Sequence, residues 1–334
     1  MFERLSLSTS FTLAHFSDPH LGPLPPAGWR SLANKRLSGF LSWTRNRVKI
    51  HRSDILALLT EDLARQPVDH VAITGDLVNI SLPGEFSAAA AWLRTIGTPD
   101  RVTVIPGNHD AYVNVAWSQS LALWADYMRG ARTPTGPETL PGSMTDFPFI
   151  RRLGPIALVG TSTALPMPVF VAAGRLGPAQ CDRLRAQLKQ LGTEGLFRVV
   201  LIHHPPFGGG AYKRKALLDA SKFQAVLAEA GAEMVIHGHT HVSGLARATT
   251  PAGTIPVIGV PSASAIAAGH KDPARYHLYR IERTADSWSL DVEIRGLSAA
   301  ADGFERQGSM ALTIPLLSLP PRATPPGTAT AAVA

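Results

Sequence analysis

Five short polar motifs in this chain each follow a run of apolar residues. They are Asp18-Pro19-His20, Gly75-Asp76, Gly107-Asn108-His109-Asp110, His203-His204-Pro205 and Gly238-His239-Thr240-His241. The motifs contain carboxylates, an amide oxygen and imidazoles. Mixed ligation of this kind suits Mn, Fe or Zn, whereas calcium takes oxygen ligands almost exclusively. The sequence therefore indicates a paired transition-metal site and, with it, a metal-dependent hydrolase.

The apolar run before each motif has the length of a buried strand. These runs cover residues 11–16, 68–73, 102–105, 199–202 and 234–236. Because α/β folds usually bind ligands at the carboxyl ends of their strands, polar residues from distant segments can converge there. The pairs Asp18/His20 and His239/His241 are expected to point the same way, since alternate residues of an extended segment share a face.

A buried histidine can also be an ordinary core residue. We expect this for His15, His51, His70, His270 and His277. For the motif residues this explanation fails. Burying several carboxylates and imidazoles without a cation would leave polar groups unpaired, at roughly 1 to 3 kcal/mol each.

The five motifs resemble, in order, the D-x-H, G-D, G-N-H-D, H-x-P and G-H-x-H blocks of the calcineurin-like metallophosphoesterases. They extend from Asp18 to His241. The resemblance implies an α/β fold in which two mixed sheets form a four-layer α/β/β/α sandwich. It also implies two divalent transition-metal ions, Mn, Fe or Zn, and attack of a metal-bridging hydroxide on a phosphate ester.

Carried onto this sequence, the resemblance implies a set of metal ligands with one shared carboxylate. The predicted ligands are Asp18, His20, Asp76, Asn108, His203, His239 and His241. Asp76 would bridge the two ions. Asp18, His20 and His241 would complete one site, and the remaining residues the other. His203 is favoured by the H-x-P spacing, although His204 also satisfies it when followed by Pro205-Pro206.

The family pattern also assigns two residues that are not ligands. His109 is expected to stabilise the transition state or to protonate the leaving oxygen, and Asp110 is expected to orient His109. His237 is expected behind the ligands or in the core. An ordinary histidine pKa near 6.5 suits either duty of His109.

Length and composition fit one large domain. The chain has 334 residues, 45% of them hydrophobic. Because the motifs run through most of it, we expect one catalytic domain over residues 1–317, with an insertion at about residues 23–52. The Pro/Ala/Thr-rich residues 318–334 have little to bury and are expected to be disordered.

The insertion concentrates positive charge. Residues 21–53 contain no acidic residue, and their basic residues are Arg30, Lys35, Arg36, Arg45, Arg47, Lys49 and Arg52. One face of a helix there would carry Leu37, Phe40, Leu41, Thr44 and Val48, with Trp43 at the flank. Two interpretations stay open. The helix either packs its apolar face on the domain, or forms a lid that touches an anionic lipid or membrane surface.

The sequence also bounds the compartment. Cys181 is the only cysteine, so no intrachain disulfide is expected and a reducing compartment is favoured. The apolar residues after Ser10 lead directly to Asp18 and read as a strand, not as a signal peptide. We therefore expect a cytoplasmic protein, with peripheral association at the inner membrane surface as a further expectation.

Several substrates remain open. A net charge of +7 favours an anionic partner, and a small phosphate ester fits. The G-N-H-D and H-H-P-P residues resemble cyclic-nucleotide and glycerophosphodiester phosphodiesterases, which favours a diester over a monoester. The insertion instead resembles UDP-diacylglucosamine pyrophosphohydrolases, which are lipid phosphoesterases. A non-enzymatic metal-binding scaffold is a second alternative, and nucleic acid is not expected because only charge supports it.

Overall fold

The computed structural model describes residues 10–207, 213–251 and 253–316. The predicted disordered tail, residues 318–334, lies outside this range. Within the described part of the chain, no helix is both long and apolar enough to cross a membrane.

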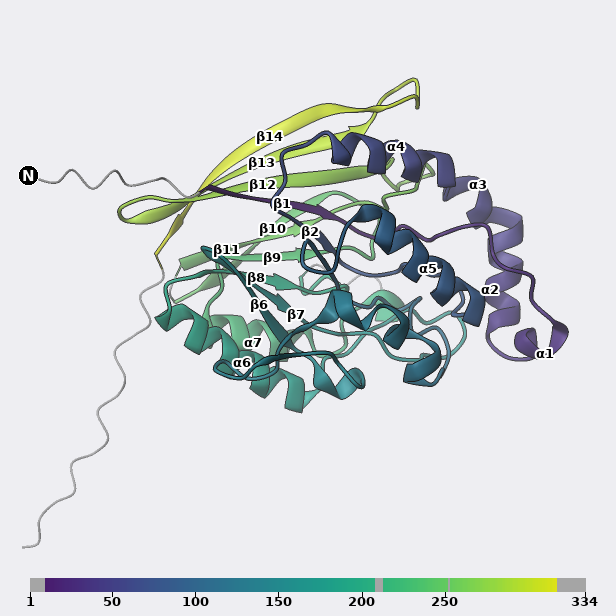
Figure 1. Ribbon diagram of the computed structural model, residues 1–334, viewed down its shortest axis with the longest axis horizontal. Coiled ribbons are helices and arrows are strands. Elements are labelled where there is room, and N and C mark those ends of the chain that lie inside the picture. Colours follow the sequence, from purple (N-terminus) through teal and green to yellow (C-terminus); the bar gives the residue numbers. More distant parts are fainter. Residues whose placement is uncertain (1–9, 208–212, 252, 317–334) are drawn as a thin grey trace, which may run out of the picture.

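Two mixed β-sheets form the centre of the fold (Figure 1). The six-stranded sheet, in the order β14-β13-β12-β1-β2-β3, consists of β1 (Ser10–Phe16), β2 (His70–Ile73), β3 (Val102–Val104), β12 (Arg275–Arg283), β13 (Ser287–Leu297) and β14 (Phe304–Pro315). The eight-stranded sheet, in the order β10-β11-β9-β8-β7-β6-β4-β5, consists of β4 (Gly130–Ala131), β5 (Glu138–Thr139), β6 (Phe149–Leu153), β7 (Ile156–Gly160), β8 (Phe197–Leu201), β9 (Met234–His237), β10 (Gly244–Thr250) and β11 (Gly253–Gly259). Strands β1 to β3 are parallel to one another, as are β7, β8, β9 and β11.

Helices cover the outer face of each sheet. The six-stranded sheet is covered by α4 (Ser53–Ala64) and α5 (Pro83–Ile96), and the eight-stranded sheet by α6 (Pro178–Thr193) and α7 (Ala220–Ala230) (Figure 1). Short 3-10 turns occupy Trp117–Gln119, Leu121–Met128, Met144–Asp146 and Lys213–Lys215. The predicted α/β/β/α arrangement of two mixed sheets is therefore confirmed.

The alternation of side chains along each strand builds two cores. Val199 and Leu201 of β8 belong to the cluster that also holds Leu13 of β1, between the two sheets. Val200, which lies between them in the sequence, packs instead with Leu184 of α6. Because successive side chains of a strand point to opposite faces, a continuous apolar run can serve both layers.

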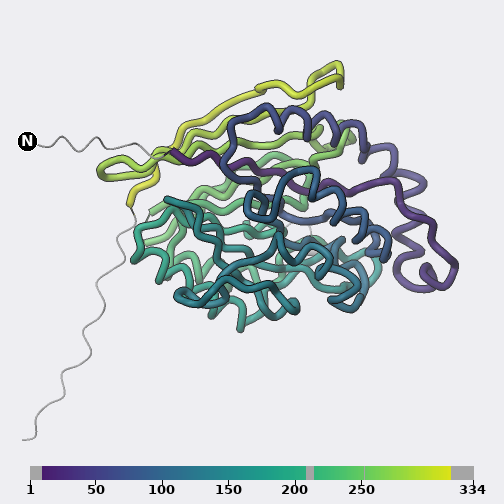
Figure 2. The backbone as a smooth tube through the Cα atoms, in the orientation of Figure 1, coloured from purple at the N-terminus to yellow at the C-terminus, as the bar shows by residue number. Residues whose placement is uncertain are grey.

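The insertion lies at one end of the molecule, where the chain leaves β1 (Figure 2). It contains α1 (Trp29–Leu32), α2 (Arg36–Ser42), the π-helical turn η1 (Trp43–Arg47) and α3 (Val48–Ile50). Of the two interpretations of its apolar face, packing on the domain disagrees with the structure, because Leu37, Leu41 and Val48 are 50%, 39% and 43% exposed. Trp43, expected at the flank, is buried. The insertion therefore contacts the domain through the face that carries Trp43.

Candidate metal centre

Every predicted metal ligand lies just beyond the carboxyl end of a strand. The ligands that follow β1, β2 and β3 are Asp18, His20, Asp76 and Asn108. Those that follow β8 and β9 are His203, His239 and His241. The stacking of the two sheets brings the two groups together, because parallel strands in each sheet end on the same side.

Most of these ligands have a left-handed backbone. Positive φ angles occur at Asp18 (53°), His20 (44°), Asp76 (57°), His239 (71°) and His241 (57°). This conformation is uncommon for residues other than glycine and costs on the order of 1–3 kcal/mol each. The side chains of each pair are therefore directed by tight turns beyond the strand, and not by the alternation of an extended segment as expected.

The glycines of three motifs leave room for these turns. A Cβ atom on Gly107 would meet the carboxylate and backbone of Asp76, and one on Gly238 would meet the carboxylate of Asp18. Gly75 has a φ of 97°, and a Cβ there would meet the backbone of Gly107. A larger residue at Gly107 or Gly238 would therefore push against a predicted ligand.

One half of the centre consists of Asp18, His20 and His241, and we call it the His20 half. The Nε2 atom of His241 lies 3.1 Å from Asp18 Oδ1 and 3.3 Å from His20 Nε2. His20 Nε2 is 3.8 Å from both Asp18 Oδ1 and Asp76 Oδ2. Two imidazole nitrogens and two carboxylate oxygens thus face one small volume.

The other half consists of Asn108, His203 and His239, and we call it the His203 half. His203 Nε2 lies 3.4 Å from Asp76 Oδ2 and 3.1 Å from Asn108 Oδ1. The Nδ1 atom of His203 donates to the carbonyl oxygen of Thr74 at 2.6 Å, a contact that fixes the direction of the ring. Asp76, His203 and His239 each offer a ligand atom within 4.8 Å of the others.

The ring of His204 packs against His239, with centroids 4.2 Å apart, but its nitrogens face away from this group. Its Nδ1 atom lies 2.7 Å from Thr163 Oγ1, and its Nε2 atom lies 3.1 Å from the carbonyl oxygen of Ala172. Both ring nitrogens are therefore engaged outside the centre. The geometry supports His203 over His204 as a ligand, and the choice stays a prediction.

Burial keeps most of the imidazoles in a form that can bind a metal. It lowers the pKa of His20, His239 and His241 below the ordinary value, so that these rings are neutral near pH 7. Burial alone would raise the pKa of Asp18, but the neighbouring His241 lowers it, and the carboxylate stays charged. His203 is the exception, because burial alone would lower its pKa but Asp76 raises it to about 9, and this ring would release a proton when it binds a metal. Imidazoles beside charged carboxylates are the donor set that a divalent transition ion takes, so these residues fit such an ion.

Asp110 shapes the loop that carries Asp76 and does not contact the ring of His109. Its carboxylate accepts backbone N–H groups at 2.8, 2.9, 3.1 and 2.8 Å from Asp76, Leu77, Val78 and Gly107. The role predicted for Asp110, orienting the imidazole of His109, is therefore corrected. Asp110 joins the loop after β2, which carries Asp76, to the loop after β3, which carries Asn108.

His109 lies beside the His20 half. Its ring centroid is 4.9 Å from that of His20, and its Nδ1 atom contacts the carbonyl oxygen of Asn79. The backbone N–H of His109 donates to Asp76 Oδ1 at 2.7 Å. Burial and the nearby Arg47 lower the pKa of His109 to about 3. Because His20, Asp76 and His109 could also share an ion, the prediction that His109 is not a ligand stays a prediction.

Three side chains that the sequence did not assign to the centre lie against the His20 half. His51, expected in the core, has its ring centroid 4.5 Å from that of His20. Arg47 reaches His20 from η1, with Nη2 3.0 Å from Nε2. Lys271 places Nζ 3.1 Å from His241 Nδ1. The basic composition of the insertion was a signal for Arg47, whereas Lys271 belongs to no motif.

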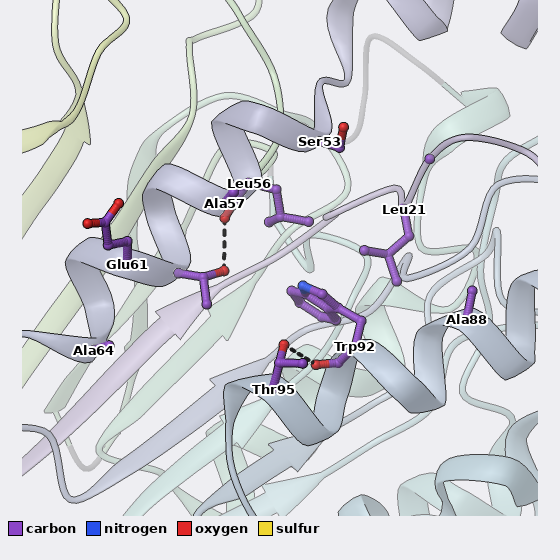
Figure 3. Close-up of a pocket in the computed structure, with 11 residues that line it drawn as sticks. Leu21, Ser53, Leu56, Ala57, Glu61, Ala64, Ala88, Trp92 and Thr95 are labelled. Atoms are coloured by element: carbon purple, nitrogen blue, oxygen red, sulfur yellow. Dashed lines mark hydrogen bonds between the residues drawn. The ribbon is translucent and has the colours of Figure 1, made fainter.

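A separate groove of about 540 Å³ lies between α4 and α5 (Figure 3). Its lining is mainly apolar and includes Leu21, Leu56, Ala57, Ala88 and Trp92. None of the predicted ligands, and neither His109 nor Asp110, lines this groove. The groove and the candidate metal centre are therefore different features of the surface.

Comparison with known proteins assigns the family. The two stacked mixed sheets form a fold that is shared with a solved dimetal phosphatase. The profile of the calcineurin-like phosphoesterase family matches residues 11–243. The chain belongs to the calcineurin-like phosphoesterase family, as its motifs indicated.

A curated relative and two solved structures are similar to the chain. Glycerophosphodiester phosphodiesterase GpdQ of Enterobacter lignolyticus is 28% identical over 196 residues, which cover 58% of this chain and 56% of that protein. A purple acid phosphatase from yellow lupin, 13% identical, has a TM-score of 0.58 over 97% of this chain and 58% of that one. A dimetal phosphatase from Danio rerio, 15% identical, has a TM-score of 0.54 over 91% and 99%. The two structures show a shared fold.

Proposed function

We propose that this chain is a phosphoesterase that holds two divalent transition-metal ions and hydrolyses a phosphodiester in preference to a phosphomonoester. The observation that carries the proposal is the meeting of the two halves at Asp76. One carboxylate oxygen of Asp76 lies 3.8 Å from His20 Nε2 and 3.4 Å from His203 Nε2. Membership of the family supports hydrolysis of a phosphate ester. The relative named as a glycerophosphodiester phosphodiesterase supports the preference for a diester.

The residues divide the work between them. Bound divalent ions would supply an activated water and neutralise the charge that develops on the phosphoryl oxygens. Asp76 would serve both ions, since its Oδ2 atom faces both halves. His109, held through Nδ1 by the Asn79 carbonyl, would direct Nε2 to the substrate. An anionic phosphate beside this ring would raise its pKa, so that it could stabilise the transition state or protonate the leaving oxygen.

Metal removal and a substrate panel test this function. A protein stripped by a chelator should lose hydrolysis, and Mn, Fe, Co or Zn should restore it. The panel should contain glycerophosphodiesters, cyclic nucleotides, phosphomonoesters and lipid pyrophosphates. Full turnover by the metal-free protein would contradict the two-metal mechanism. Faster turnover of monoesters than of diesters would reverse the proposed preference.

A second candidate is a lipid phosphoesterase that works at an anionic membrane surface. The supporting observation is the exposed side of the insertion, where Trp29 is 74% exposed and Leu37 is 50% exposed. Arg30, Arg45 and Lys49 are exposed on the same insertion. Apolar side chains that insert into the headgroup region, together with cations that attract anionic lipids, are the features of a peripheral membrane contact.

Vesicle binding tests this second candidate. The protein should sediment with anionic vesicles at low salt and be released as salt rises, since the charges are screened over about 10 Å at 0.1 M. Arg45→Glu with Lys49→Glu should reduce sedimentation while hydrolysis of a small soluble diester stays unchanged. Equal sedimentation of the variant and the wild type would show that Arg45 and Lys49 do not contribute to vesicle binding. Failure of the wild type to bind anionic vesicles would remove the candidate.

A further inference from the structure

Arg47 reaches into the centre from the insertion. Its Nη2 atom lies 3.0 Å from His20 Nε2, and its Nη1 atom lies 3.2 Å from His109 Nε2. The guanidinium thus lies between a predicted ligand of the His20 half and the residue predicted to act on the transition state. None of the other basic residues of the insertion has a described contact with His20 or His109.

The acceptors that Arg47 has within the protein are poor ones. Among the described residues, the buried Arg198 pairs with Glu233 at 2.8 Å, and Arg295 pairs with Asp62 at 2.7 Å. No described carboxylate forms an ion pair with Arg47, although it is enclosed among His20, His109 and the ring of Trp43. A guanidinium has five donors and stays charged, so it is suited to an anion with several oxygens.

The backbone around Arg47 is held in place before any anion arrives. The carbonyl oxygen of Arg47 accepts the backbone N–H of His51 at 2.8 Å. The ring of Trp43, one turn earlier, is buried and stacks on His51 with centroids 6.3 Å apart. A Cβ atom on Gly22 would lie only 3.0 Å from the same tryptophan. An arginine fixed in this way loses little freedom when it binds.

We propose that Arg47 binds the phosphate group of the substrate, donating from its guanidinium to the oxygens that face His20 and His109. The proposal rests on the phosphoesterase function and adds a substrate-binding residue that comes from the insertion and not from any family motif. Arginine is preferred for this task because its planar fork matches two phosphate oxygens at once. The insertion is then part of the substrate site, and this holds whether or not its exposed side contacts a membrane.

Binding of inorganic phosphate to the metal-loaded protein tests the proposal, with Arg47→Met as the main variant. Losing hydrogen bonds to a charged group should raise the Kd for phosphate roughly tenfold to a hundredfold by calorimetry. Metal content should stay at the wild-type level. Arg47→Lys should fall between the two, because it keeps the charge and loses the fork. Arg45→Met is the matched control and should leave the phosphate Kd unchanged.

The outcomes separate this proposal from the function on which it rests. If the wild type hydrolyses phosphate esters and Arg47→Met binds phosphate as tightly as the wild type, Arg47 is not a phosphate ligand. If Arg47→Met loses metal, its role is to support the metal ligands and the proposal is also overturned. Arg47→Lys covers the case in which Arg47→Met does not fold. A folded lysine variant that binds phosphate more weakly than the wild type would still support the proposal. A wild type that hydrolyses no phosphate ester would refute the function itself.

Discussion

The two halves of the centre have different surroundings. The His203 half is directed by backbone carbonyls, since His203 Nδ1 contacts Thr74 and His239 Nε2 contacts the carbonyl oxygen of Lys215 at 3.1 Å. The His20 half is surrounded by other side chains, including Arg47 and Lys271. Carbonyls that orient imidazoles favour firm metal binding, whereas nearby cations favour an anionic substrate. Together with the proposed function, the difference predicts that phosphate approaches from the side of the His20 half.

Removing the shared carboxylate should have the largest effect, because it breaks both halves at once. Asp76→Ala should abolish measurable hydrolysis and lower the metal content from about two ions per chain toward none. Elemental analysis and turnover measure this. Asp126→Ala, at an exposed carboxylate paired with Arg129, should keep both ions and full activity. An Asp76→Ala protein that retained both ions would show that the halves do not share this ligand.

Breaking one half should have a smaller effect on metal content. His203→Gln should leave about one ion per chain and strongly reduce hydrolysis, since only the His203 half loses a ligand. His204→Gln is the matched change at the adjacent position, and it should keep both ions because the ring of His204 faces Thr163 and Ala172. If metal were lost only from His204→Gln, His204 and not His203 would be the ligand.

The smallest of these effects on the metals should come from His109. His109→Ala should lower kcat by roughly 10²-fold or more, the usual contribution of a general acid, with both ions retained. Steady-state kinetics and elemental analysis of the same preparation measure this. Loss of an ion from His109→Ala would mean that the His20 half includes His109 as a ligand.

The sequence could predict where the candidate ligands lie relative to the strands, because each motif is local. An apolar run followed by Gly75-Asp76 or by Gly238-His239 identifies a strand and the turn after it within a few residues. The alternation of Val199, Val200 and Leu201 between two cores also follows from a single strand.

The neighbours of the centre could not be predicted because they depend on long-range packing. Arg47 lies 62 positions from His109 in the sequence, and Lys271 lies 30 positions from His241. Helical periodicity grouped Leu37 with the apolar face and put Trp43 at its flank. In the structure Trp43 is buried in the π-helical turn, and the insertion turns the face that carries Trp43 to the domain. The hydrogen bonds from backbone N–H groups to Asp110 were not predicted, because the motif suggested only that Asp110 orients its neighbour His109.

In the proposed centre, the carboxylate of Asp76 would be shared by two metal ions. Electron paramagnetic resonance of the protein loaded with Mn²⁺ tests it most directly, because ions about 3.5 to 4 Å apart are magnetically coupled. We expect a coupled two-manganese spectrum in the wild type that is lost in Asp76→Ala. A spectrum of isolated Mn²⁺ in the fully loaded wild type would contradict it.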